Sequence, residues 1–202
     1  MKRTILMAFM ALFSLVLSAQ NATKARQILD KTAAIVGNKD GASAHFKISG
    51  ESTGQVSGTI AIKGNRFRAT TPDASVWYDG KNQWTYMKDT EEVNISRPTE
   101  AQQAKMNPYT FITLYKKGYT LGMTNVSGGY KVHLTAQDKS RAIQEMFITI
   151  NSKTYLPTTV KMKTKGKWTT ITISNFKATK QSDASFTFNS KDFPEAEVID
   201  LR

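Results

Sequence analysis

The fold is decided by residues 75–96, which read SVWYDGKNQWTYMKDTEEVNIS. Apolar and polar residues alternate through most of this stretch, and Asp79-Gly80 interrupts the alternation. A period of two is typical of strands with one buried face, and an Asp-Gly pair favours a tight turn. The stretch therefore predicts three consecutive strands at 75–78, 83–88 and 92–96, arranged as a meander.

The same period recurs on both sides of this stretch. Twelve candidate strands, few helices and no alternation of strand and helix predict one mainly β (α+β) domain rather than a parallel α/β fold. We expect its antiparallel sheet to curl into a barrel or a partial barrel. The other nine candidate strands are 44–50, 56–63, 66–70, 119–126, 130–136, 144–150, 158–165, 168–175 and 184–188.

Three segments have helical patterns. Apolar residues recur at helical spacing between Ala25 and Val36, and Gly37-Asn38 supplies a stop. Residues 99–102 form a capping box that predicts a short helix. A second helix is expected to begin at Pro108 and to end in Lys116-Lys117-Gly118, with basic residues in its last turn and a C-cap glycine.

The N-terminus has the pattern of a secretory signal peptide. Lys2 and Arg3 precede an apolar run over residues 5–17, which ends in Ser18-Ala19. We expect cleavage after Ala19, so that residues 1–19 are the signal peptide and residues 20–202 form a single domain in the periplasm. The sequence contains no cysteine, which excludes a lipid anchor at the cleavage point, disulfides and a zinc framework.

The chain is strongly basic. Its formal charge is +12, of which Lys2 and Arg3 contribute two. In an exported chain this charge favours acidic lipid head groups, acidic polymers or acidic protein faces, and not nucleic acid. Lys161, Lys163, Lys165 and Lys167 occupy every second position, so a continuous strand would align them on one face. That face is either a docking stripe for an anionic surface or the ordinary solvated side of a strand.

Residues that support catalysis are few. His45 and His133 lie far apart with no second ligand at metal-binding spacing, so we expect neither a metal nor a cofactor. The sequence predicts that the protein is not an enzyme. The rival hypothesis is an envelope hydrolase that uses Asp89, Glu91, Glu92 and His133.

Apolar residues crowd the first half of the predicted sheet. A closed barrel would use them for packing, whereas an open half-barrel capped by residues 109–115 would leave a pocket between sheet and helix. The sequence is compatible with both. The candidate ligand-binding residues of the pocket and its cap are Phe46, Ile48, Ile60, Ile62, Phe67, Trp77, Trp84, Tyr86, Tyr109, Phe111, Ile112 and Leu114.

Several stretches resemble one family. Residues 76–86, VWYDGKNQWTY, resemble the hairpin signature of the periplasmic outer-membrane lipoprotein carrier family, LolA. Residues 58–63 with 66–68 are similar to the preceding strand pair of that family, and residues 107–111 to the start of its lid helix. The chain end, with residues 186–188, 193–194 and 198–200, is similar to the C-terminal pattern of the family.

The resemblance implies an unclosed antiparallel β-barrel with an N-terminal helix and a short helical lid over its concave apolar side. It also implies a monomeric carrier that shelters the acyl chains of lipoproteins. An inner-membrane transporter would release these lipoproteins to the carrier, and an outer-membrane acceptor, protein or lipid, would receive them. An alternative with the same fold is an envelope sensor that binds lipid or lipoprotein.

The sequence departs from the family pattern at one position. The family often has an arginine near the end of the strand at 58–63, where it helps to retain cargo, and here that position is Lys63 or Gly64. Lysine keeps the charge but loses the planar fork of arginine. The resemblance therefore makes Lys63, Arg66 and Arg68 the basic candidates for cargo retention.

Overall fold

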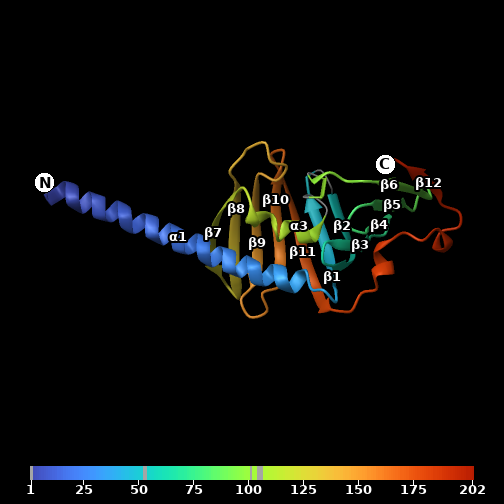
Figure 1. Cartoon of the computed structure of the whole chain (residues 1–202), viewed down its shortest axis with the longest axis horizontal. Coiled ribbons are helices and arrows are strands. Elements are labelled where there is room, and N and C mark those ends of the chain that lie inside the picture. The colour runs from blue at the N-terminus through green and yellow to red at the C-terminus, as the bar shows by residue number, and fades with distance from the viewer. Residues whose placement is uncertain (1, 52–53, 101, 104–106) are drawn as a thin grey trace.

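The computed structural model describes residues 2–51, 54–100, 102–103 and 107–202, with side chains from residue 19 onward except those of 108 and 109. A long N-terminal helix precedes two runs of strands, and short helical turns separate these runs (Figure 1). The strands are β1 Ala42–Gly50, β2 Gly54–Lys63, β3 Arg66–Thr70, β4 Ala74–Tyr78, β5 Gln83–Met87, β6 Glu92–Ser96, β7 Tyr119–Val126, β8 Gly129–Ala136, β9 Glu145–Asn151, β10 Pro157–Thr164, β11 Lys167–Ala178 and β12 Glu197–Asp200. The helical elements are α1 Lys2–Val36, α3 Pro108–Phe111 and the 3₁₀ turns η1 Leu114–Lys116, η2 Asp183–Phe186 and η3 Ser190–Asp192.

All twelve strands belong to one sheet. Its order is β12-β6-β5-β4-β3-β2-β1-β11-β10-β9-β8-β7, so two meanders are joined where β1 pairs with β11. Neighbouring strands are antiparallel except for β12, which runs parallel to β6. Because β7 and β12 form two separate edges, the sheet is unclosed, and the predicted mainly β half-barrel is confirmed.

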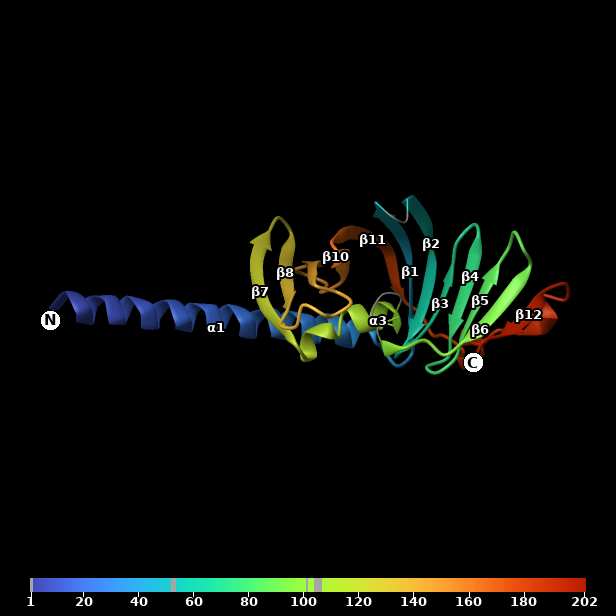
Figure 2. The ribbon, with the colours of Figure 1, turned by 90° about the horizontal axis from the view of Figure 1, so that it is seen from above.

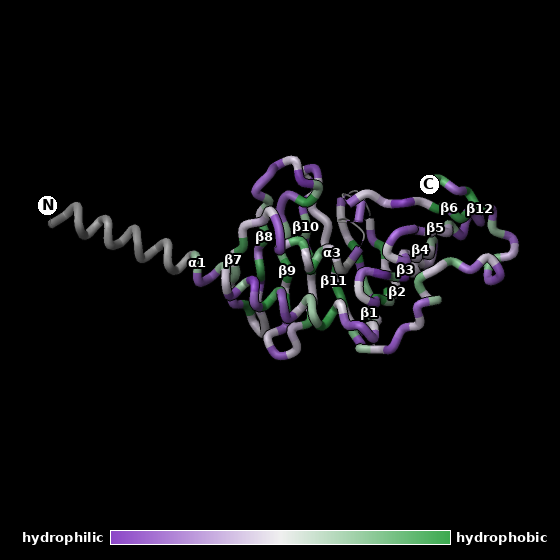
Figure 3. The backbone as a smooth tube through the Cα atoms, viewed as in Figure 1, coloured by the Kyte–Doolittle hydropathy of each residue, from purple (hydrophilic) through white to green (hydrophobic). Residues whose placement is uncertain are grey.

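The sheet has an inner face, which α1 and α3 cover, and an outer face. Apolar and polar residues are interleaved along the strands (Figure 3). On β11, Ile171 and Ile173 point to the inner face, whereas Thr172 and Ser174, which alternate with them, are exposed. This alternation follows from the period of two that the sequence shows. On the strands that α1 and α3 cover, this alternation places the apolar side chains under the helices.

Helix α1 fills the inner face over β7–β10. Ala25 and Leu29 are fully buried there, in one cluster with Leu134 and Ile148 of the sheet. Gly37 donates its N–H to the carbonyl of Ala33 and ends the helix, as predicted. The N-terminal half of α1 extends beyond the edge strand β7 (Figures 1 and 2). Among the described residues, no helix is both long and apolar enough to cross a membrane.

The predicted helix from Pro108 to Lys117 is wrong in its extent. It is split into the single turn α3 and the 3₁₀ turn η1. The break lets neighbouring side chains reach different cores: Phe111 packs in the cluster under α1, whereas Ile112 packs with Ile62 and Phe67. In a continuous helix, two neighbouring side chains are only about 100° apart around the helix axis, so both would point to nearly the same side. The capping box before it is present, since Thr99 and Gln102 exchange hydrogen bonds.

The chain end differs from the prediction at two places. The expected strand at 184–188 is wrong, because residues Asp183–Phe186 form the turn η2, in which Phe186 is completely buried. An isolated apolar residue that fills a gap produces the same short alternation as a strand. Strand β12 was not predicted, since a parallel edge strand of four residues has no hairpin turn to indicate it.

Candidate functional site

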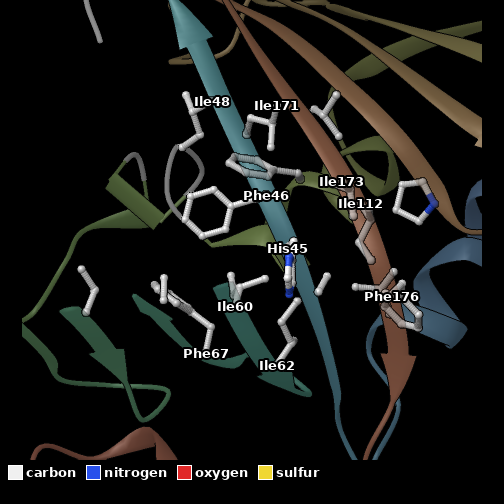
Figure 4. Close-up of a pocket in the computed structure, with 17 residues that line it drawn as sticks. His45, Phe46, Ile48, Ile60, Ile62, Phe67, Ile112, Ile171, Ile173 and Phe176 are labelled. Carbon is white, nitrogen blue, oxygen red and sulfur yellow. The ribbon is translucent and has the colours of Figure 1, made fainter. Parts of the chain in front are cut away.

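An apolar cavity of about 240 Å³ lies between the inner face of the sheet and its helical cover. Strands β1–β4 and β10–β11 form its floor, and the end of α1 and the α3 region close it (Figure 4). Among the lining residues that the structure describes, the exposed His45 supplies the one polar side chain. These described residues are Val36, Ala44, His45, Phe46, Ile48, Ile60, Ile62, Phe67, Ala69, Val76, Phe111, Ile112, Pro157, Val160, Ile171, Ile173 and Phe176.

This lining favours a ligand made of hydrocarbon. Each methylene group removed from water contributes about 0.8 kcal/mol. The cavity is smaller than the roughly 300–1,000 Å³ of a typical ligand pocket. A ligand with a long chain would therefore have to displace part of the cover, where Phe111 and Ile112 are the closing side chains.

A β-bulge supplies one wall of the cavity. The register of β1 against β11 shifts between Ser43 and His45, and Asn175 on β11 has a φ of +52°. The extra residue resets the alternation, so that Phe176 faces inward although Ser174 faces outward. The bulge therefore adds an aromatic ring to the cavity that regular alternation would turn to solvent.

The structure brings together seven of the twelve candidate ligand-binding residues. These seven line the cavity: Phe46, Ile48, Ile60, Ile62, Phe67, Phe111 and Ile112. Leu114 is not among the residues that line the cavity, and it packs against the cluster under α1. The side chain of Tyr109 lies outside the described residues.

The placement of Trp77, Trp84 and Tyr86 in the cavity is wrong. Val76 and Tyr78 occupy the inner face of β4, so Trp77 between them points outward, and Trp84 lies opposite it on β5. The outer face there is covered by the C-terminal segment. The ring of Trp77 lies 5.6 Å from that of Phe193, and the ring of Tyr86 lies 4.7 Å from it.

The sequence-based prediction missed part of the lining. Ile171 and Ile173 follow the same period of two as the residues that were found, so the alternation of their strand was a sufficient signal. Val36 follows the helical spacing of α1. Phe176 had no such signal, because its direction depends on the bulge at Asn175.

The basic candidates for cargo retention do not line the cavity. Lys63 and Arg66 instead hold Asp183 of the C-terminal segment, with Nζ and Nη1 at 2.7 and 3.0 Å from its Oδ1. The hydrogen bond from Lys63 is the main cause that lowers the pKa of Asp183. Arg68 lies on the outer face, with its Cζ 5.5 Å from the Trp77 ring centroid. Lys63 and Arg66 therefore anchor the C-terminal segment to the first half of the sheet.

The predicted lysine stripe is shorter than expected. Lys165 has a φ of +49° and forms the turn with Gly166, so only Lys161 and Lys163 share a strand face. Their ammonium groups lie 4.8 and 5.7 Å from the Trp168 ring centroid on the outer face. Cation–π contacts of this kind stabilise a solvated strand face.

The candidate residues of the hydrolase hypothesis do not form one site. Glu92 begins β6 and Glu91 directly precedes it, whereas His133 lies on β8. Eight strands separate β6 from β8 in the sheet. His133 Nε2 instead contacts Glu145 at 2.9 Å. Within the described residues, no group of three His, Cys, Asp or Glu side chains is placed to hold a metal ion.

An unclosed half-barrel with an apolar cavity under a helical cover defines the class of this protein. The model of the family described as "Outer membrane lipoprotein carrier protein LolA" matches residues 15–167. The chain belongs to this family, whose fold supports the binding of lipid or lipoprotein. No curated protein matches the chain.

Solved structures with a similar fold come from several bacteria. An uncharacterized conserved protein from Thermus thermophilus is 16% identical and has a TM-score of 0.59, with 88% of this chain and 99% of that chain covered. A LolA superfamily protein from Nitrosomonas europaea is 14% identical, with a TM-score of 0.46 and coverage of 81% and 97%. A putative outer membrane lipoprotein-sorting protein domain from Vibrio parahaemolyticus is 10% identical, with a TM-score of 0.47 and coverage of 86% and 97%. The Thermus protein supports the fold.

Proposed function

We propose that this protein is a periplasmic carrier that binds the acyl chains of lipoproteins in its apolar cavity and moves them from the inner to the outer membrane. The single observation that carries the proposal is the almost entirely apolar lining of the cavity under a short, broken cover. Membership of the LolA family supports it. The carrier performs no covalent chemistry in this proposal and acts as a monomer.

The cavity suits transient binding. An acyl chain gains about 0.8 kcal/mol for each methylene that it buries. A pocket that enclosed the whole chain would retain it too strongly for transfer, whereas a cavity of about 240 Å³ closed by Phe111 and Ile112 encloses part of it. The partners of the proposed cycle are an inner-membrane lipoprotein-releasing transporter and an outer-membrane acceptor.

The arrangement of α1 supports export. The contacts of α1 with the sheet include Asn21, whose side-chain amide donates to the Met123 carbonyl at 2.9 Å and accepts from the Met123 N–H at 2.6 Å. This residue lies two positions after the predicted cleavage point at Ala19. Removal of residues 1–19 therefore leaves these described contacts intact, as a cleaved signal peptide requires.

The test is release of lipoproteins from spheroplasts of the host. Purified protein is incubated with them, and we expect lipoproteins to appear in the soluble fraction bound to it. Ile171→Asp places a carboxylate in the cavity and should abolish release, whereas the matched variant Thr172→Asp places it on the exposed side of the same strand and should not. Absence of release, together with absence of co-purified lipid in native mass spectrometry, would refute the proposal. A lipid-binding sensor would show bound lipid without release.

A further inference from the structure

A second pocket lies on the other side of the segment that closes the cavity. We call residues 110–114 the cover segment. Phe111 and Ile112 of this segment line the apolar cavity, whereas Thr110, Thr113 and Leu114 line a separate pocket of about 610 Å³. One short segment thus forms a wall of both compartments.

Two basic side chains and one unpaired buried donor line the second pocket. Lys117 and Arg141 line it, and within the described residues neither has an ion-pair partner within 4.0 Å. The Nε2 of Gln103 is buried and has no hydrogen-bond partner among the described residues. Glu100 is the one acidic residue of the lining. A buried donor without an acceptor costs free energy, so a ligand with acceptor oxygens would be stabilised here.

Arg141 is held in place without an ion pair. Its Cζ lies 5.1 Å from the centroid of the Tyr119 ring, and its guanidinium group packs against Gly118, where an added Cβ would lie 2.2 Å from Nη2. The Tyr119 hydroxyl donates to the carbonyl of Ile143; burial raises its pKa, and a hydrogen bond and the charge of Arg141 partly oppose this rise. Asp138, the acid nearest in sequence, accepts a hydrogen bond from the N–H of Ser140, the main cause that lowers its pKa, and the charge of Arg141 adds a smaller effect without an ion pair within 4.0 Å. The guanidinium group is therefore preorganised for an anion.

We propose that this pocket binds the negatively charged head group of the amphiphile whose acyl chain lies in the apolar cavity. The inference rests on the proposed function and deepens it, since it names the polar part of the ligand. The cover segment is one layer of chain that runs from the end of α3 through a turn to the start of η1. A single layer of helix-like chain is roughly 10 Å thick with its side chains, and this is the distance that a ligand must bridge between the two compartments. The shared chemistry is an anionic oxygen group, either the phosphate of a lipid or a carboxylate of an acylated peptide.

The test compares paired ligands with the same acyl chain, of which one member carries an anionic group that the other lacks. Palmitoyl lysophosphatidylglycerol is paired with monopalmitoylglycerol, and a palmitoylated Cys-Asp-Ser peptide with its Cys-Asn-Ser counterpart. Affinities are measured by competition with a neutral fluorescent acyl probe. We expect the anionic member of one pair to bind about tenfold more tightly, the effect of one charge-assisted hydrogen bond. The pair that shows the difference identifies the source of the anionic group.

Neighbouring basic residues provide the controls. Lys117→Gln and Arg141→Gln should each reduce the advantage of the anionic ligand by about threefold to tenfold and leave the neutral ligand unchanged, and Arg141→Lys should restore part of it. Lys116→Gln and Lys139→Gln remove the same charge at exposed positions outside the pocket and should have no effect. Thermal melting checks that each variant is folded.

The possible failures are distinguishable. Equal affinity for both members of each pair would overturn the inference while leaving the cavity as a binding site. An advantage that the pocket variants and the control variants reduce equally would also overturn it, because the net charge of +12 would then be the cause. If none of the four ligands binds, the proposed function itself fails.

Discussion

The ring of Phe46 lies over Gly58 on the neighbouring strand, with its Cζ 2.8 Å from the position that an added Cβ would occupy. On its other side, the same Cβ would lie 2.2 Å from the carbonyl oxygen of Thr70. Because Gly58 has no side chain, the Phe46 ring has room in the lining of the cavity while β2 remains paired with both neighbours.

We expect Gly58→Ala to lower the free energy of unfolding by about 1–3 kcal/mol, because the clash with Thr70 involves backbone that a rotamer change cannot relieve. Chemical denaturation measures the change. Gly122→Ala is the matched control, since Gly122 also lies within a strand and an added Cβ would meet no atom within 4 Å. A loss of the same size in both variants would show that the cost is not the contact with Phe46 and Thr70.

Phe111 and Trp84 should differ in their effect on lipid binding. Phe111→Asp places a carboxylate at the closing side of the cavity, where it would be desolvated by an acyl chain, and should weaken binding of a fluorescent fatty acid at least tenfold. Trp84→Asp changes the outer face and should leave the affinity within about twofold. Both variants are first checked by circular dichroism. If Trp84→Asp weakens binding as strongly as Phe111→Asp, the assignment of the cavity to the inner face is wrong.

The period of two was sufficient to predict eleven of the strands and the inward direction of residues such as Phe46 and Ile60. The same rule applies to Trp77, whose predicted place in the cavity is wrong: it lies between Val76 and Tyr78, so the period of two turns it to the outer face. Phe176 was not predictable in this way. Its direction depends on a bulge, which is a property of the pairing between two strands and not of either strand alone.

The 3₁₀ turn η2 at the chain end and the broken helix over the cavity also depend on tertiary contacts, as the direction of Phe176 does. Phe186 alternates with polar neighbours as a strand residue would, yet it fills a gap from a 3₁₀ turn. The segment after Pro108 has a helix signal at each end, with Pro108 at its start and Lys116-Lys117-Gly118 at its end. It is interrupted after Phe111, which packs in one apolar cluster while Ile112 packs in the other, and this packing is set by residues far away in the sequence.

Helix α1 should contribute to stability through its C-terminal half. Leu29 is fully buried against the sheet, so Leu29→Ala should lower the free energy of unfolding by about 2–5 kcal/mol. Gln27→Ala, at an exposed position of the same helix, should change it by less than about 0.5 kcal/mol. Deletion of residues 1–19 should leave the melting temperature unchanged. A large loss of stability on that deletion would contradict the assignment of these residues to a removable segment.

The anchor of the C-terminal segment should depend on pH. The hydrogen bond from Lys63, followed by the charges of Lys63 and Arg66, lowers the pKa of Asp183 in the folded protein. Because the folded pKa lies below that of the unfolded chain, about 3.9 for aspartate, the contribution of this carboxylate to stability is complete above the unfolded value. It is lost as the pH falls through the folded pKa. We therefore expect the melting temperature of Asp183→Asn to lie below that of the unmodified protein at pH 6. This difference should shrink as the pH falls below about 4.

Asp192→Asn is the control, since Asp192 is exposed and has no ion pair among the described residues, and it should show no such difference. A difference for Asp183→Asn that stays constant down to the acid limit would show that its carboxylate does not anchor the segment through charge.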